Sequence, residues 1–249
     1  MKKTLLLGSF VIFSAASFVA CDVLEDVGGS ILETGGGSGE KALTNDEVIA
    51  GLKEALTVGT NNSAGLASKM DGFNKNAKIR LPFPEDAMKV KEKAIQWGME
   101  DKVEEFELTL NRAAEEAAKE AAPIFVNAVK EMTVQDGFAI LKGEDNAATK
   151  YLQDKTTAGL KTAFTPKVEA AIATVNLTKY WEPLSKKYNQ AMTLTGGEKV
   201  NTDLTAYVTD KAIAGLFVLI AEEEGKIRDN PAARVTDILK RVFGSVDNN

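Results

Sequence analysis

The chain has 249 residues, 44% of them hydrophobic and 27% charged, which is the composition of an ordinary globular protein. Its formal net charge is −6 and it has no basic run, so no binding to nucleic acid is expected, because that binding depends on neutralising phosphates. It contains no histidine and one cysteine, which excludes a Ser-His-Asp triad, a zinc site built from His and Cys, and an intramolecular disulfide.

Residues 1–20 have the pattern of a secretory signal peptide. Two lysines precede an apolar stretch that is too short for a stable membrane span, and small residues close it. The following cysteine, in Ser17-Phe18-Val19-Ala20-Cys21, stands as in a bacterial lipobox. We therefore expect Cys21 to carry lipid at the mature N-terminus and to anchor the protein in a membrane. The protein is then expected to be exported to the periplasm or the cell surface. The sequence leaves open whether the inner or the outer membrane carries it.

The stretch after Cys21 is rich in glycine and serine as far as residue 43, which is the composition of a flexible tether. Thr44-Asn45-Asp46-Glu47 is a capping box and predicts the first helix of a domain spanning residues 44–245. Residues 246–249 are expected to form a disordered tail.

The first helix is expected from Asp46 to about Val58, where Gly59 ends it, with a short helical piece at 63–70. Residues 79–84 (Ile-Arg-Leu-Pro-Phe-Pro) contain two prolines, which favour an extended backbone. We expect this segment, called the strap below, to lie across the bundle.

Helical spacing continues to the C-terminus. Prolines are expected to interrupt it at Pro123 and Pro166, because a proline lacks the N–H that an inner helical turn needs. The apolar run from Ala212 to Ala221 predicts a helix that is buried all round, and Pro231 opens a last helix. With about nine or ten helices and no strand pattern, the fold class predicted is all-α, a single multi-helix bundle with one proline-rich strap.

Several stretches occur in one order that is specific to a known family. They are residues 51–56, 58–60, 71–73, 79–82, 111–115, 132–143, 147–151 and 205–234. Together they resemble DUF4197, a family of uncharacterised bacterial envelope proteins, over about residues 43–243. The resemblance implies a secreted or lipid-anchored helical protein. It carries over no activity, substrate or catalytic residue, since the family has none assigned.

The acidic run at 222–224 suggests a first candidate site. Helical spacing places Glu223 or Glu224 on or beside the apolar face of its helix. A carboxylate that is partly buried there needs a partner, for which Arg112 and Arg234 are the candidates. In a second interpretation the acidic run is solvated and pairs with basic side chains of the next turn, Lys226 or Arg228.

The strap and an aromatic helix suggest a second candidate. The residues concerned are Leu81, Phe83, Tyr180, Trp181 and Tyr188. They either form a surface for an apolar ligand or fill the core. No calcium-loop spacing is present, and neither a metal nor a cofactor is expected.

These observations favour a lipid-anchored envelope protein that is non-enzymatic and acts by binding or as a structural module. The expected partners are the membrane, through the lipid, and a protein or apolar ligand of the envelope. A carrier of an apolar or lipid ligand is the first alternative. An enzyme that uses carboxylates is the second, and it requires a cleft where acids converge with raised pKa values.

Overall fold

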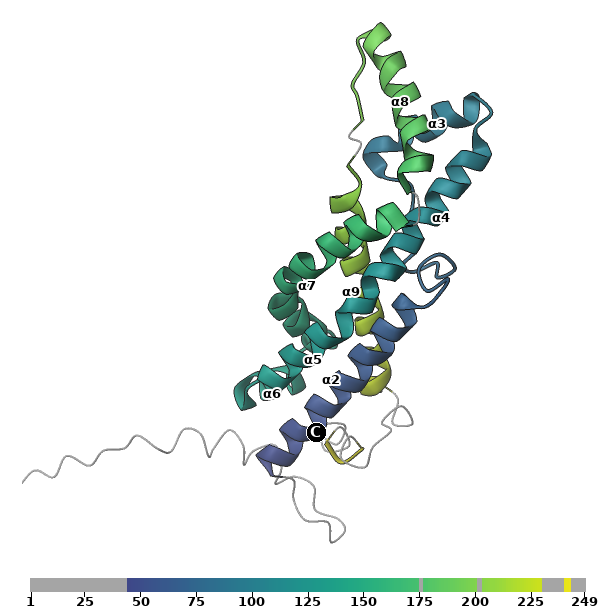
Figure 1. Ribbon diagram of the computed structural model, residues 1–249. Helices are drawn as coiled ribbons and strands as arrows, with labels where there is room; N and C mark the ends of the chain where they lie inside the picture. Colours follow the sequence, from purple (N-terminus) through teal and green to yellow (C-terminus); the bar gives the residue numbers. More distant parts are fainter. Residues whose placement is uncertain (1–43, 175–176, 201–202, 230–239, 243–249) are drawn as a thin grey trace, which may run out of the picture.

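The computed structural model describes residues 44–174, 177–200, 203–229 and 240–242, and within them the chain is all-α (Figure 1). Eight α-helices, two short 3-10 helices and no strand occur in these ranges, which confirms the predicted fold class. The elements are α2 (Asn45–Ser68), η1 (Glu85–Ala87), α3 (Met88–Gln96), α4 (Glu100–Ala117), η2 (Ala118–Glu120), α5 (Ala121–Glu131), α6 (Val134–Leu141), α7 (Ala147–Thr174), α8 (Leu177–Thr195) and α9 (Thr205–Asp229).

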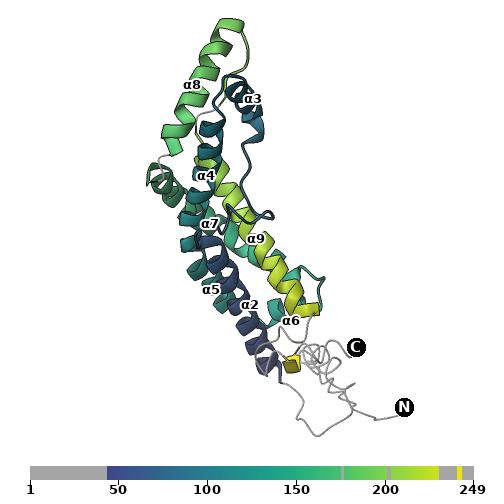
Figure 2. The ribbon, with the colours of Figure 1, turned by 90° about the vertical axis from the view of Figure 1, so that its right-hand side faces the viewer.

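The bundle is elongated, with α2, α4 and α9 running along its length (Figures 1 and 2). Helices α3 and α8 lie at one end, whereas α6 and the start of α2 lie at the other. Helix α9 packs against α7, α2 and α4, so three helices cover most of its surface. None of the helices in the described ranges has the length and hydropathy to cross a membrane.

The start of α2 is the predicted capping box. The Glu47 amide donates to Thr44 Oγ1 at 3.3 Å, and Glu47 Oε2 accepts from the Thr44 amide at 2.8 Å. The expected end at Gly59 is wrong, because α2 continues to Ser68. Gly59 is buried against α9, where a Cβ would lie 3.6 Å from Glu223 Cβ, so packing keeps the helix intact there.

The prolines act differently at the two predicted positions. Pro123 lies in the first turn of α5, just after η2 has interrupted the helical path. A proline is tolerated there because the N–H groups of a first turn have no partner within the helix. Pro166 does not break α7, which runs through it. Phe164 and Val168 flank this proline and are both fully buried, so core contacts on either side hold the helix together. The expectation of two separate helices here was wrong.

Helix α9 is the central helix of the bundle. The sequence predicted that it is buried on all sides, and this expectation is wrong. Leu216 is inaccessible to solvent, whereas Val218 on the opposite side is 40% exposed. The three neighbouring helices leave this one face open, which explains the difference. The last helix, expected from Pro231, lies outside the described residues except for 240–242.

The strap crosses the bundle as predicted. Its three apolar side chains, Ile79, Leu81 and Phe83, are buried. Just before it, the ring of Phe73 lies so near to Gly215 on α9 that a Cβ there would be 2.8 Å from it. The absence of a side chain at Gly215 therefore lets the connection between α2 and η1 pack directly on the central helix.

Candidate functional site

Glu224 on α9 is buried, and its carboxylate caps the N-terminus of α7. It accepts hydrogen bonds from the amides of Ala148 and Thr149 at 2.9 and 2.8 Å, and from the Thr149 hydroxyl at 2.7 Å. These amides have no partner within a helix, because they belong to its first turn. A negative charge at this end of a helix is also favoured by the helix dipole. Glu224 therefore ties α9 to α7.

The arginine that pairs with Glu224 is Arg228, one turn further along α9. Its Nε lies 3.0 Å from Glu224 Oε1, and its Nη2 donates to the Ile140 carbonyl of α6 at 2.9 Å. Glu223 is directed elsewhere, since it pairs with Lys226 and accepts from Asn62 at 3.5 Å. Together Glu224 and Arg228 join three helices.

The structure does not bring Arg112 to either of these acids. Arg112 lies on α4, where it bonds to Glu115 at 2.6 Å and to Asp71 at 2.7 Å. Its closest acids are therefore one turn along its own helix and in the connection after α2. The other predicted partner, Arg234, is outside the described residues.

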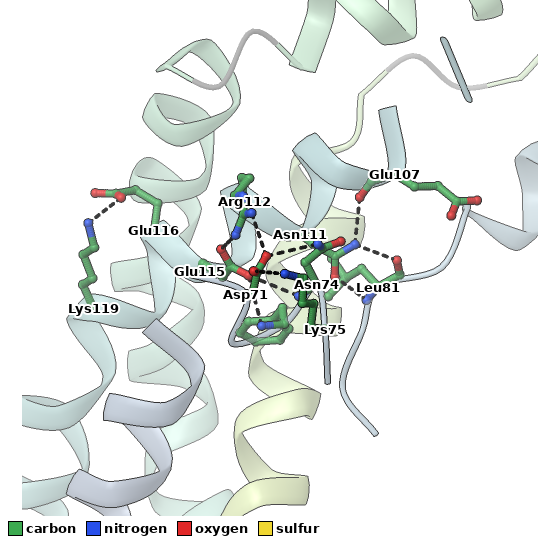
Figure 3. A network of polar contacts seen from close by, with 11 residues as sticks. Asp71, Asn74, Lys75, Leu81, Glu107, Asn111, Arg112, Glu115, Glu116 and Lys119 are labelled. Atoms are coloured by element: carbon green, nitrogen blue, oxygen red, sulfur yellow. Dashed lines mark hydrogen bonds and ion pairs between the residues drawn. The ribbon is translucent and has the colours of Figure 1, made fainter. Parts of the chain in front are cut away.

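A second polar cluster, drawn in Figure 3, holds the connection between α2 and η1 on α4. The amide of Asn111 is fully buried and makes two bonds with the backbone of Leu81. It accepts from the Leu81 N–H at 2.8 Å and donates to the Leu81 carbonyl at 3.0 Å. The N–H and the C=O of Leu81 are therefore both hydrogen-bonded by a side chain instead of a neighbouring strand, as buried backbone groups must be.

Glu115 fixes the beginning of the same connection. Its Oε1 accepts from the amides of Phe73 and Asn74, each at 3.1 Å. Asp71 beside it has φ of 64°, the left-handed region that non-glycine residues seldom adopt. The hydrogen bonds from Lys75, Asn74 and Arg112 hold the pKa of Asp71 well below its usual range. Asp71 therefore stays charged at neutral pH and helps fix the turn.

Glu107 is the third carboxylate of the cluster and binds two cations. Arg80 Nη2 lies 2.7 Å from its Oε2, and Lys91 Nζ lies 2.6 Å from its Oε1. Burial alone would raise the pKa of Glu107, but the hydrogen bonds and charges of Lys91 and Arg80 outweigh it and keep that pKa below its ordinary value. Glu107 thus stays charged between its two basic partners.

The three residues that hold the strap share a simple spacing that the sequence analysis missed. Glu107, Asn111 and Glu115 lie at i, i+4 and i+8 on α4, so they form one row along the helix. The row runs beside the buried positions Phe106 and Leu110. A row of polar residues next to an apolar stripe was the available signal that α4 holds a buried polar segment.

A groove of about 520 Å³ opens beside this cluster. The ion group of Arg80, Lys91 and Glu107 lines it together with Ile95 of α3 and Leu108 of α4. The two aliphatic side chains are 42% and 39% exposed, respectively. The strap, α3 and α4 therefore surround a space that presents fixed charges and accessible apolar surface side by side.

A second groove, of about 610 Å³, lies along α8. It is lined by Lys186, Gln190 and Thr193 among others, and its lining residues include no exposed large apolar side chain. Asn189 closes one wall by bonding to both backbone groups of Val200, at 2.9 and 3.2 Å.

The residues proposed as an apolar ligand surface lie in the core. Leu81, Phe83, Trp181 and Tyr188 are all 5% exposed or less. The ring of Trp181 stacks on Phe106 at 4.8 Å between centroids and meets the edge of Phe83 at 5.9 Å. The side chain of Tyr180 lies outside the described set. The four described side chains thus pack against one another and their neighbours.

Cys21, the predicted lipid attachment site, falls in residues 1–43, outside the described ranges. Within the part of the chain that the structure describes, no group of three or more acidic or cysteine side chains has the geometry of a metal site.

Comparison with known proteins gives one finding. A family model described as "Protein of unknown function (DUF4197)" matches residues 42–244, close to the range of the resemblance seen in the sequence. No curated protein and no solved structure matches the chain.

Proposed function

The chain belongs to the DUF4197 family of proteins of unknown function, and from this premise we propose that it is a membrane-anchored, non-enzymatic binding protein of the cell envelope. The observation that carries the proposal is the groove between the strap, α3 and α4. Its volume of about 520 Å³ is within the range of small-molecule sites, about 300–1,000 Å³. The charged side chains of Arg80 and Lys91 are held in the groove by hydrogen bonds to Glu107, so the site is formed before a ligand binds.

The state of the buried carboxylates supports binding over acid–base catalysis. A general acid needs a pKa that is raised towards the working pH. The pKa of Glu107 is shifted the other way, below its ordinary value. Glu224 and Glu115 each accept backbone hydrogen bonds that fix a helix or a turn. Protonating Glu224 or Glu115 would weaken these hydrogen bonds, so both carboxylates are better suited to a structural role than to proton transfer.

Core packing supports the groove over an internal apolar cavity. The aromatic rings of Phe83, Phe106 and Trp181 are in contact, with centroids 4.8–5.9 Å apart, and leave no space for a lipid chain between them. The pocket beside Glu224 has a volume of about 30 Å³, far below the range of small-molecule sites. A carrier of apolar molecules would need a space at least ten times larger.

The anchor is proposed from the sequence alone. Lipid on Cys21 would be joined to the bundle through residues 22–43, the predicted glycine-rich tether. Helix α2 starts at the end of the bundle that is opposite to α3 and α8 (Figure 1). The proposed anchor therefore attaches at the end of the bundle that is opposite to α3 and the groove.

Two experiments test the two parts of this proposal. For the anchor, cells that express the wild type or Cys21→Ser are grown with labelled palmitate. We expect label and membrane fractionation for the wild type and neither for the variant, and an unlabelled, soluble wild type would contradict the anchor.

For binding, a photoreactive amino acid is placed at Ile95 in the groove or at Leu194, which is 89% exposed and outside it. Irradiation of intact envelopes should give an adduct of defined mass at position 95 only. The same adducts at both positions, or none at position 95, would contradict a site in the groove.

A further inference from the structure

We propose that the groove binds a short peptide with free termini and apolar side chains, two or three residues long. This inference rests on the proposed function, because it names the ligand class for the same groove. It is drawn from the sign, the spacing and the polarity of the residues that line the groove.

The lining of the groove carries more acidic than basic side chains. Two cations, Arg80 and Lys91, face three carboxylates, those of Glu100, Glu104 and Glu107. With this excess of acids a simple anion such as inorganic phosphate would be repelled. A ligand that carries one positive and one negative group meets a favourable charge at each end, and its own net charge is zero.

The positive and negative charges of the groove are separated along α4. Glu100, Glu104 and Glu107 lie at i, i+4 and i+7 on α4, so they share one side of the helix. The two cations are bonded to Glu107, at one end of this row. From Glu107 to the acids at the other end, the rise along α4 is about 5 Å to Glu104 and about 10 Å to Glu100.

That separation selects a peptide over a free amino acid. The ammonium and carboxylate of a free amino acid are joined through a single carbon atom. An extended chain lengthens by about 3.3–3.6 Å for each residue, so the termini of a dipeptide or tripeptide lie about 7–10 Å apart. The carboxylate would then lie at Arg80 and Lys91, and the ammonium at Glu104 or Glu100.

Both cations keep N–H donors that do not contact Glu107. Arg80 contacts Glu107 through Nη2, and its side chain is 40% exposed. Lys91 contacts Glu107 through one bond of its ammonium, and its side chain is 30% exposed. A guanidinium has five N–H donors and an ammonium three, so both can bind a ligand carboxylate while Glu107 holds them in place.

The apolar part of the groove accounts for the side chains. Ile95 and Leu108 are each about two-fifths exposed, and both line this groove. A single exposed aliphatic residue is ordinary on a protein surface, but two on the walls of one groove give it an apolar portion. Leucine-like side chains of a bound peptide would cover them and gain the free energy of apolar burial.

The test is isothermal titration of the full chain, purified in detergent, with three probes. The dipeptide Leu-Leu has both termini free, N-acetyl-Leu-Leu lacks the ammonium, and Leu-Leu amide lacks the carboxylate. We expect saturable binding of Leu-Leu and at least tenfold weaker binding of each blocked form. Equal affinities for all three, or no heat with Leu-Leu at millimolar concentration, would overturn the proposal.

Variants locate the site. Replacing both rim acids (Glu100→Gln with Glu104→Gln) leaves the ion group around Glu107 intact and should weaken Leu-Leu at least fivefold, with no effect on N-acetyl-Leu-Leu. Glu92→Gln is the matched control, because Glu92 is exposed on α3 and does not line the groove. An equal loss in the control would overturn the assignment. An adduct at position 95 without any binding of Leu-Leu would reject the peptide class and leave the proposed function standing.

Discussion

The carboxylate of Glu224 on α9 accepts hydrogen bonds from both the backbone N–H and the hydroxyl of Thr149 on α7, 75 residues earlier in the chain. A cap supplied by the side chain of another helix is a tertiary contact as well as a local one. The central helix therefore fixes where α7 begins, and Arg228 extends the same connection to α6.

Glu224→Gln should lower the free energy of unfolding by about 3 kcal/mol, since a neutral amide removes the negative charge that faces Arg228 in a mostly buried position. Urea unfolding monitored by circular dichroism measures the change. Glu222→Gln is the control. Its partner Lys78 is 64% exposed, and such surface pairs contribute about 0–1 kcal/mol. A loss as large in the control would contradict the special role of Glu224.

Asn111→Asp should release the strap. An aspartate can still accept from the Leu81 amide, but it places a buried charge against the Leu81 and Glu107 carbonyls, to which Asn111 now donates. We expect a loss of about 3 kcal/mol and faster hydrogen exchange at the Leu81 amide. Asn61→Asp, at an exposed position of α2, is the control and should leave this exchange rate unchanged. Unchanged exchange in Asn111→Asp would contradict the clamp.

The predicted ion pair on α9 was foreseen only in part from the sequence. The periodicity of α9 placed one acid on its apolar face, because that depends on helix geometry alone. The arginine that pairs with Glu224 is local too, because Arg228 lies four residues further along α9 and was named in the second interpretation of the acidic run. The burial of this pair, and the different role of Arg112, depend on tertiary structure. Arg112 belongs to the strap cluster with Asp71, and no local pattern in the sequence places Asp71 beside it.

The same distinction applies to the fold. The capping box at Thr44 is a local signal between residues three apart, and the structure confirms it. Gly59 and Pro166 are also local signals, but buried contacts against α9 and within the core outweigh them. The number of helices was therefore less predictable than their class.

The ion group around Glu107 predicts a specific dependence on pH. The pKa of Glu107 is lowered in the folded protein, so the charged form is favoured by folding. Its contribution to stability is complete above the ordinary pKa of 4.5 and is lost as the pH falls through the folded value. Glu107→Gln should therefore reduce stability at pH 7 and flatten the decline below pH 4.5.

Thermal unfolding of both proteins between pH 3 and pH 7 measures this effect. The control is Glu105→Gln, whose carboxylate pairs with a Lys102 side chain that is 47% exposed. It should keep the steep decline of the wild type. Parallel curves for the wild type and Glu107→Gln would show that Glu107 has no part in the acid response.

Thr209→Val should make the protein more stable. Among the described side chains, the hydroxyl of Thr209 is buried without a hydrogen-bond partner. Valine has the same shape and removes the unsatisfied group, so a gain of about 1 kcal/mol is expected. Thr149→Val, which loses the bond to Glu224, should instead destabilise. Chemical denaturation compares the two, and a loss of stability in both would contradict this assignment.

A ligand bound in the groove between the strap, α3 and α4 would lie against the side chains of Ile95 and Leu108. NMR of the methyl-labelled full chain, titrated with Leu-Leu, therefore tests for binding in this groove. Binding there should give saturable shifts of the Ile95 and Leu108 methyl signals, and none at Leu194, which is 89% exposed outside the groove. Shifts at Leu194 with Ile95 and Leu108 unchanged, or no saturable shift at any methyl group, would contradict it.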